Sequence, residues 1–373
     1  MKKKLVLLVT IFLVLSIFLS ACGQKTVEEP EAIEDKGLSI MLILTGSLGD
    51  LGLGDMVNAA LKDYADKYNG ELSVFECAYD ASLYEPSVMD IAESGKYDLI
   101  VTGFYNMKEA VEHTAVKYPD QKFLVYDVEM DYTDGKNKNV VSVQSKQNEG
   151  AFLAGVIAAL MTTSGAEFTN PEKIVGYVGA AENTAILDFL VGYIDGVKYV
   201  DTQIEILYSF VGDWSNTAKA KELGLSQYQQ GADVSFSVCG SAGLGVAEAA
   251  KEVDKLSIGV DYDYAEAIKD GNLATAEHIM TSAVKDFYTI LYNNVVEIHE
   301  GTIEWGTHRI YGYAEKGVNL SDNEFYQKLV PDNIKQQFNE IAAKLAAGEI
   351  DVKTAIGATQ EQIEQFKEMA KPY

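Results

Sequence analysis

From Gly37 onward, short apolar runs alternate with longer segments whose apolar residues recur at helical spacing. The short runs are continuously apolar, as expected for the strands of a parallel sheet that helices cover on both faces. Two such series follow one another, the first ending near 139–143 and the second beginning with an apolar helix predicted over 149–162. The pattern therefore predicts an α/β protein with two doubly wound parallel-sheet lobes around a ligand cleft.

The expected elements can be stated by residue range. The strands are predicted at 38–44, 72–77, 98–103, 122–128, 139–143, 174–178, 204–210, 234–238, 256–260 and 309–314. The helices are predicted at 56–68, 85–94, 107–117, 149–162, 187–198, 217–230, 245–253, 282–297 and 331–346. In open α/β sheets ligands bind outside the carboxyl ends of the strands, so the loops there are the candidate site.

Residues 1–21 have the organisation of a signal peptide. Three lysines precede an apolar run that is too short for a comfortable membrane span, and Leu-Ser-Ala stands directly before Cys22. This string resembles a bacterial lipobox, which implies that Cys22 carries acyl chains such as palmitate; an ordinary signal peptide followed by a chance cysteine is the alternative. We expect a lipid-anchored protein on the extracytoplasmic face of the cell membrane.

The rest of the chain divides into a tether and a globular part. Residues 22–36 are polar and acidic, which predicts a flexible tether. The remaining length exceeds one usual core, so we expect a first lobe of 37–145 plus roughly 264–300 and a second of 146–263 plus roughly 301–373. The net charge of −26 argues against a nucleic-acid partner. A monomer is expected.

Templates for catalysis and for cofactors fail. There is no GxSxG string with a usable histidine and no HExxH, and the first glycine loop has no nearby lysine or arginine for a phosphate. The four histidines are scattered, so we expect no metal. Cys77 and Cys239 lie in separate apolar runs and are interpreted as separate buried thiols. We predict a protein that binds a solute and is not an enzyme, with no cofactor.

Several loops after strands carry residues suited to a ligand. Asp261 follows a strand, where a carboxylate can accept both hydroxyls of a vicinal diol. Trp214 could stack on a flat base or a sugar face, or simply cap the core of its lobe. The glycine loop 240–245 opens a helix with backbone N–H groups, and the loop 46–55 carries Asp50 and Asp55. Asp55 could instead be an ordinary N-cap.

Six segments in this order resemble the basic membrane protein family, the purine-nucleoside receptor lipoproteins that feed ABC transporters. They are GSLGDLGLGD, SVQSKQNEGAFLAGVIAAL, VGYVGAAENTAILDFLVGYIDGVK, QQGADVSFSVCGSAGLGVAEAAKE, SIGVDYD and IMTSAVKDFYTILYN. The resemblance covers nearly the whole mature domain. It implies a type I periplasmic-binding-protein fold with three crossovers between two lobes that close on the ligand.

The resemblance also implies roles for individual residues. Asp261 would hold the ribose hydroxyls, and Lys285 is the lysine of the family's S-x-x-K helix. Gly243 matches the glycine of the later glycine loop, Trp214 an aromatic that stacks on the base, and Asp50 an acidic position of the first loop.

Two departures affect the base end of this site. The first loop of the family usually ends in a Phe-Asn-Asp-like string, and here Leu53 and Gly54 replace the stacking phenylalanine and the amide. The string after Asp261 also lacks the family's glutamine. Purine specificity should therefore be weaker, while the sugar end is intact.

The sequence thus predicts a substrate-binding lipoprotein of an ABC importer that binds a nucleoside, purine first, or a related ribosyl compound by hinge closure. Its partners would be that small molecule and a membrane permease. The alternative is a ligand-sensing lipoprotein that signals to a membrane partner. An enzyme acting on nucleosides would need a general acid or base beside Asp261, and we disfavour it.

Overall fold

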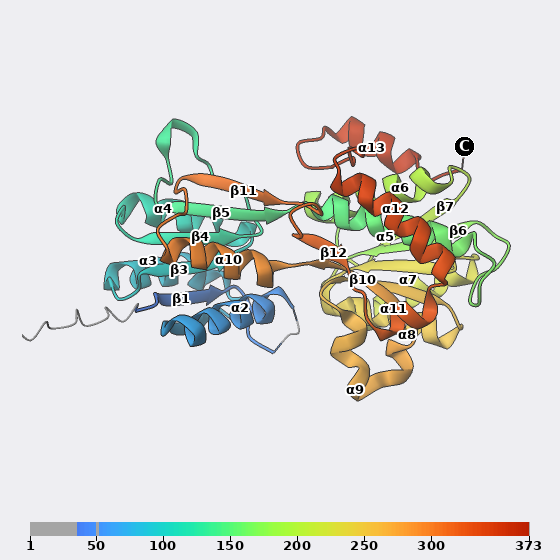
Figure 1. Ribbon diagram of the computed structural model, residues 1–373, viewed down its shortest axis with the longest axis horizontal. Helices are drawn as coiled ribbons and strands as arrows, with labels where there is room; N and C mark the ends of the chain where they lie inside the picture. Colours follow the sequence, from blue (N-terminus) through green and yellow to red (C-terminus); the bar gives the residue numbers. More distant parts are fainter. Residues whose placement is uncertain (1–35, 50–51, 373) are drawn as a thin grey trace, which may run out of the picture. The chain divides into compact units, whose positions relative to one another are not determined.

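The computed structural model describes residues 36–49 and 52–372, and its strands form two sheets. The first sheet has the order β11-β5-β4-β3-β1-β2, with every neighbouring pair parallel (Figure 1). Its strands are β1 (Ser39–Leu44), β2 (Glu71–Glu76), β3 (Leu99–Gly103), β4 (Lys122–Tyr126), β5 (Val140–Ser145) and β11 (Thr307–Tyr311).

The second sheet has the order β12-β10-β9-β8-β6-β7, in which only β12 is antiparallel to its neighbour. Its strands are β6 (Ile174–Gly179), β7 (Glu205–Phe210), β8 (Val234–Val238), β9 (Leu256–Asp261), β10 (Ile279–Lys285) and β12 (Val318–Leu320). Within each series of five, the strand order is second, first, third, fourth, fifth. Each series is therefore a doubly wound lobe, which confirms the predicted fold class.

Helices cover both faces of the first sheet because its strands are apolar on both sides. Along β1, Ile40 and Leu42 join one buried cluster with α2 and α10, whereas Met41 and Ile43 join another with α3 and α4. Successive side chains of a strand point to opposite faces, so one apolar run serves two cores. The helices are α2 (Leu53–Tyr68), α3 (Tyr84–Ser94), α4 (Lys108–Lys117) and α10 (Phe287–His299).

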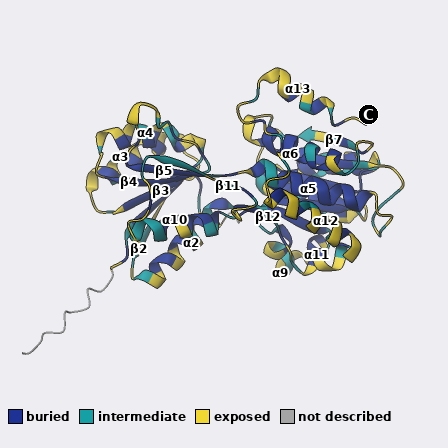
Figure 2. Ribbon diagram, turned by 45° about the horizontal axis from the view of Figure 1, so that its top comes forward, coloured by how far each residue is buried: buried dark blue, intermediate teal, exposed yellow. Residues whose placement is uncertain are grey.

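In the second lobe, the apolar helix α5 (Gln147–Thr162) is buried almost along its whole length (Figure 2). Helix α6 (Thr184–Val200) packs tightly against it, because a Cβ added at Gly196 would stand only 2.0 Å from the carbonyl oxygen of Phe152. The other helices are α7 (Thr217–Gln229), α8 (Leu244–Glu252), α9 (Tyr264–Ala276), α11 (Glu324–Leu329), α12 (Asp332–Ala346) and α13 (Gln360–Glu368).

The region 264–320 differs from its prediction. The predicted helix 282–297 is wrong at its start, since Ser282 to Lys285 end strand β10 and the side chain of Asp286 caps α10. Residues 264–300 were assigned to the first lobe, yet α9 packs in the core of the second lobe and β10 joins the second sheet. Conversely, β11 returns to the first sheet. The chain crosses between the sheets after β5, after β10 and after β11.

Cys77 and Cys239 are buried and unpaired with one another, as predicted. Among the residues that the structure describes, no helix is long and apolar enough to cross a membrane. Within the same residues, no group of three or more histidine, cysteine, aspartate or glutamate side chains is arranged to hold a metal ion.

Candidate ligand-binding site

Phe104, Asp127 and Asp261 have positive φ angles, which non-glycine residues rarely adopt, at the carboxyl ends of strands. Phe104 follows β3 with φ 68°, Asp127 follows β4 with φ 58°, and Asp261 ends β9 with φ 67°. Such a backbone costs on the order of 1–3 kcal/mol at each residue and tends to occur at functional sites. The neighbouring strand β5 holds the backbone of Asp127 in place, because the N–H of Asp127 donates to the carbonyl of Val143 at 2.9 Å.

Two of these residues meet at Lys285, the last residue of β10. Its buried ammonium donates a hydrogen bond to Oδ1 of Asp127 at 2.8 Å and lies 4.0 Å from Oδ1 of Asp261. The aromatic rings of Phe189 and Phe287 lie 6.0 and 5.5 Å from the same ammonium. Lys285 ends strand β10 of the second sheet, whereas Asp127 directly follows strand β4 of the first sheet. The ion pair between Lys285 and Asp127 therefore connects the two lobes.

The charges of this group are set by burial and by one another. Burial lowers the pKa of Lys285, but Asp127 and Asp261 raise it more, so the pKa lies above its ordinary value. Burial raises the pKa of Asp261, and Lys285 offsets this only in part. One ammonium therefore faces two carboxylates, and the ionised form of Asp261 would gain from hydrogen-bond donors that a ligand brings.

Trp214 lies in the loop after β7, and 52% of its surface is exposed. The carboxylate of Asp213 accepts the N–H groups of Ser215 and Asn216, which fixes this turn. The carbonyl of Trp214 accepts the N–H of Ala242 at 3.0 Å, so the turn is joined to the glycine loop after β8. This arrangement presents an aromatic surface at the carboxyl end of the second sheet.

The other predicted site residues are placed differently. Gly243 is buried, and an added Cβ would stand 3.0 Å from the hydroxyl of Tyr264 and 3.1 Å from Oγ of Ser237, so this glycine makes room for packing. Leu53 packs in the core of the first lobe as the first residue of α2. Asp50 and Cys22 lie outside the described residues.

The structure thus brings Asp261 and Lys285 together, and it joins the Trp214 turn to the loop that contains Gly243. Asp55 does not cap α2, because Gly52 is the N-cap; its carboxylate instead accepts the N–H of Gly49 at 2.8 Å. Two surface hollows of the second lobe, one beside Lys353 and one beside Asn319, contain none of the predicted residues that the structure describes.

Sequence reasoning missed Asp127. It follows the apolar run KFLVY as Asp261 follows LSIG and Val260, so the same signal was present. The prediction extended that strand through Val128 and thereby placed Asp127 inside it. An exposed tyrosine after a strand, Tyr79 after β2, was also missed.

Two doubly wound lobes joined by three crossings, with charged groups at the carboxyl ends of their strands, define a solute-binding protein of the type I periplasmic fold. The family model described as "ABC transporter substrate-binding protein PnrA-like" matches residues 38–354. The chain belongs to this family, which confirms the resemblance. Proteins of this class bind a solute and hand it on unchanged, so the chain is a binding protein and not an enzyme.

Similar proteins cover most of the chain. The chain is 27% identical to a CD4+ T-cell-stimulating antigen of Listeria monocytogenes, over 94% of this chain and 98% of that protein. It is 28% identical to the ABC transporter nucleoside-binding protein BmpA of Lactococcus lactis, over 71% and 72% of the two chains. An ABC transporter solute-binding protein from Aeropyrum pernix shares the fold, with a TM-score of 0.75 at 22% identity over 89% of this chain and 98% of that one.

Proposed function

We propose that the chain binds a nucleoside, or a related ribosyl compound, and delivers it to the permease of an ABC importer. The observation that carries the proposal is the group formed by Asp261, Lys285 and Asp127. The 4.0 Å separation between Asp261 and Lys285 is too long for a direct hydrogen bond, so the carboxylate keeps capacity for hydroxyl donors. A vicinal diol supplies two such donors at the spacing of one carboxylate.

The base would lie beside Trp214. An exposed indole offers a stacking face to any planar base, and stacking of this kind tolerates different bases. The name of the Lactococcus lactis relative supports a nucleoside as the ligand. The resemblance to purine-nucleoside receptors makes purine nucleosides the first candidates to test.

Closure on the ligand would use the bond between Lys285 and Asp127. This bond already joins residues that follow or end strands of different sheets, and a ligand that adds hydrogen bonds to the same group would favour the closed arrangement. The three crossings after β5, β10 and β11 are the segments that would flex.

The test is calorimetry of the purified protein with adenosine, guanosine, inosine, uridine and cytidine and with their 2′,3′-dideoxy forms. We expect the ribosides to bind and the dideoxy forms to bind much more weakly. Equal affinity for the two series would overturn the role of Asp261, and no affinity for any riboside would overturn the nucleoside proposal.

We further propose that Cys22 carries a lipid that anchors the protein to the extracytoplasmic face of the membrane. The lipobox-like string before Cys22 supports this, and two or three acyl chains hold stably where one does not. Replacing this residue in C22S should move the protein from the membrane to the soluble fraction on centrifugation. A mutant that still sediments with membranes would contradict the anchor.

A further inference from the structure

The resemblance implies a stacking phenylalanine at the position where this chain has Leu53. Leu53 does not replace its function, because its side chain packs in the core of the first lobe against the cluster that contains Leu44. If a nucleoside base is to be held from the first lobe by an aromatic ring, that ring must come from another residue.

Tyr79 is an aromatic residue whose position the first lobe fixes unusually firmly. It follows β2, and 69% of its surface is exposed. Ala78 and Tyr79 are both left-handed, with φ 50° and 63°, a conformation that costs on the order of 1–3 kcal/mol at each residue. Strained backbone of this kind tends to occur at functional sites, which points to a functional role for the exposed ring.

The backbone around Tyr79 is bound to the loop after β1. The N–H of Tyr79 donates to the carbonyl of Thr45 at 2.7 Å, and the N–H of Ala78 donates to the carbonyl of Gly46 at 3.1 Å. On the other side, the carboxylate of Asp80 accepts the N–H of Ser82 at 2.9 Å. These bonds hold the left-handed pair between two segments.

The ring of Tyr79 lies directly on Gly46. A Cβ added at Gly46 would stand 2.6 Å from Cζ of the tyrosine ring and 2.7 Å from its hydroxyl, so only glycine allows this approach. Gly46 begins the glycine loop 46–55, which follows the carboxyl end of β1. The ring is thus laid along that loop, with most of its surface exposed.

We propose that Tyr79 is a specificity-determining residue that supplies the aromatic contact of the first lobe to the base. This inference rests on the proposed nucleoside function. A ring held in position before binding loses less freedom when the ligand arrives, which favours affinity. Tyr105 is comparably exposed, at 78%, and serves as the matched control.

The experiment measures the affinity of the purified protein for adenosine and for methyl β-D-ribofuranoside, which has the sugar without a base. We expect Y79A to weaken adenosine binding by about 5- to 150-fold, the range of one base–aromatic stack, and to leave methyl riboside unchanged. Y79F should bind adenosine within about threefold of the unchanged protein, since the stacking face is kept. Y105A should have no effect on either ligand.

A second variant tests the position of the ring without removing it. In G46A the added methyl group collides with the far end of the tyrosine side chain, which can move away, so the protein should fold and the ring should be displaced. Adenosine affinity should then fall while methyl riboside affinity stays.

The outcomes separate the two proposals. If the unchanged protein binds adenosine and Y79A binds it equally well, the role of Tyr79 is overturned while the nucleoside function stands. If Y79A weakens adenosine and methyl riboside alike, the tyrosine acts on the fold and the proposal is also overturned. If the unchanged protein binds no nucleoside, both proposals fall.

Discussion

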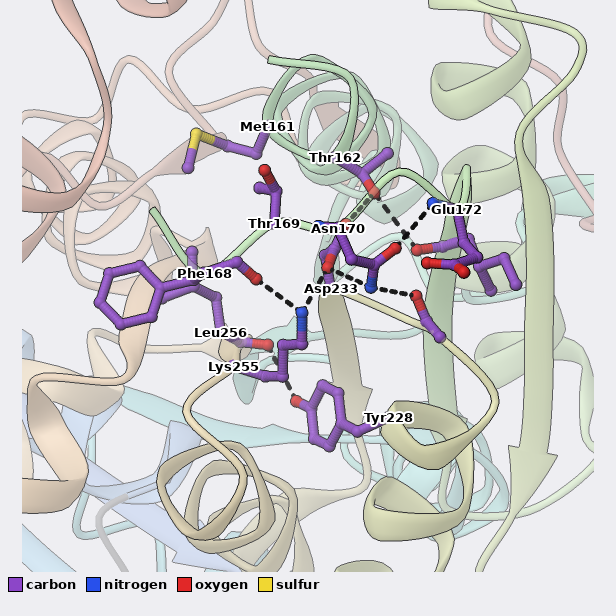
Figure 3. Close-up of polar contacts among 12 residues, drawn as sticks. Met161, Thr162, Phe168, Thr169, Asn170, Glu172, Tyr228, Asp233, Lys255 and Leu256 are labelled. Carbon is purple, nitrogen blue, oxygen red and sulfur yellow. Dashed lines mark hydrogen bonds and ion pairs between the residues drawn. The ribbon is translucent and has the colours of Figure 1, made fainter. Parts of the chain in front are cut away.

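The two ends of the second sheet carry similar charged residues that are satisfied very differently. Asp233 and Lys255 stand at the amino ends of β8 and β9, and their ion pair is 2.6 Å long. Thr162 and Asn170 donate further hydrogen bonds to Asp233, and Lys255 also donates to the carbonyl of Phe168 (Figure 3). Each oxygen of the fully buried Asp233 carboxylate is thereby hydrogen-bonded.

At the carboxyl ends, Lys285 makes one short bond to Asp127 and leaves Asp261 at 4.0 Å. The backbones of both acids are in the left-handed region, whereas Asp233 is not among the residues with positive φ. A closed polar network holds a lobe together, whereas a partly satisfied one keeps capacity for a ligand.

The largest effect is expected at the amino end. D233A leaves the ammonium of Lys255 without its partner in a mostly buried position, and breaking a buried pair costs about 3–5 kcal/mol. We expect the free energy of unfolding in urea to fall by that amount, with ligand affinity unchanged in the folded protein. A stability close to that of the unchanged protein would show that the network is dispensable.

The carboxyl end should respond in the opposite way. D261A should weaken nucleoside binding by about 2–4 kcal/mol, because hydrogen bonds to a charged group contribute ~1.5–3 kcal/mol each and do not simply add. Its free energy of unfolding should change by less than about 1 kcal/mol, since Lys285 keeps Asp127. Calorimetry and urea unfolding of D261A and D233A together would contradict the comparison if both variants lost stability equally.

A smaller effect on affinity is expected at the other exposed group of the carboxyl end. W214A should weaken every planar nucleoside by roughly 1–3 kcal/mol, because it removes one stacking face. The loss should be similar for purines and pyrimidines, and methyl β-D-ribofuranoside should be unaffected. Strong purine selectivity that survives W214A would show that another residue reads the base.

The smallest expected effect is the change of nucleoside affinity with pH. Because burial raises the pKa of Asp261, this carboxyl takes up a proton at a higher pH than the ordinary value of 3.8. The protonated acid accepts fewer hydrogen bonds, so nucleoside affinity should be constant near neutral pH and fall as the solution is acidified through that pKa.

The same shift has the opposite sign for stability. A raised carboxyl pKa in the folded state favours the protonated form, so this contribution to stability is present below pH 3.8 and is lost as the pH rises through the folded pKa. The control D261N should remove the pH dependence of binding that Asp261 causes. A D261N variant with the same acid profile as the unchanged protein would assign the profile to another group.

Much of the fold could be predicted from the sequence, and the errors have a clear cause. The continuous apolar runs of β1 and β8 predict strands, because both faces of these strands are buried and almost every residue is apolar or small. The predicted helix 282–297 includes the end of strand β10, because Ser282 to Lys285 has no pattern that separates the end of a strand from the start of the helix behind it. The lobe assignment failed with it for 264–285, whereas α10 lies in the first lobe as predicted.

The site was only partly accessible to the same reasoning. Asp261 and Trp214 could be found because each follows a predicted strand. Leu53 could be aligned with a stacking residue, but whether its side chain faces the ligand or the core depends on packing with Leu44 and other residues from elsewhere in the chain. Tyr79 gave no signal, since its position depends on contact with Gly46.

The sequence by itself determined the two α/β series and the carboxylate at the end of β9, because burial and strand ends leave local patterns. Only the tertiary structure decided which acid pairs with Lys285. Asp127 lies 158 residues from it, and no spacing along the chain reveals a hydrogen bond over that separation. Hydrophobic burial is non-directional and is read from runs of residues, whereas hydrogen bonding requires specific atoms within about 3 Å, which only folding brings together.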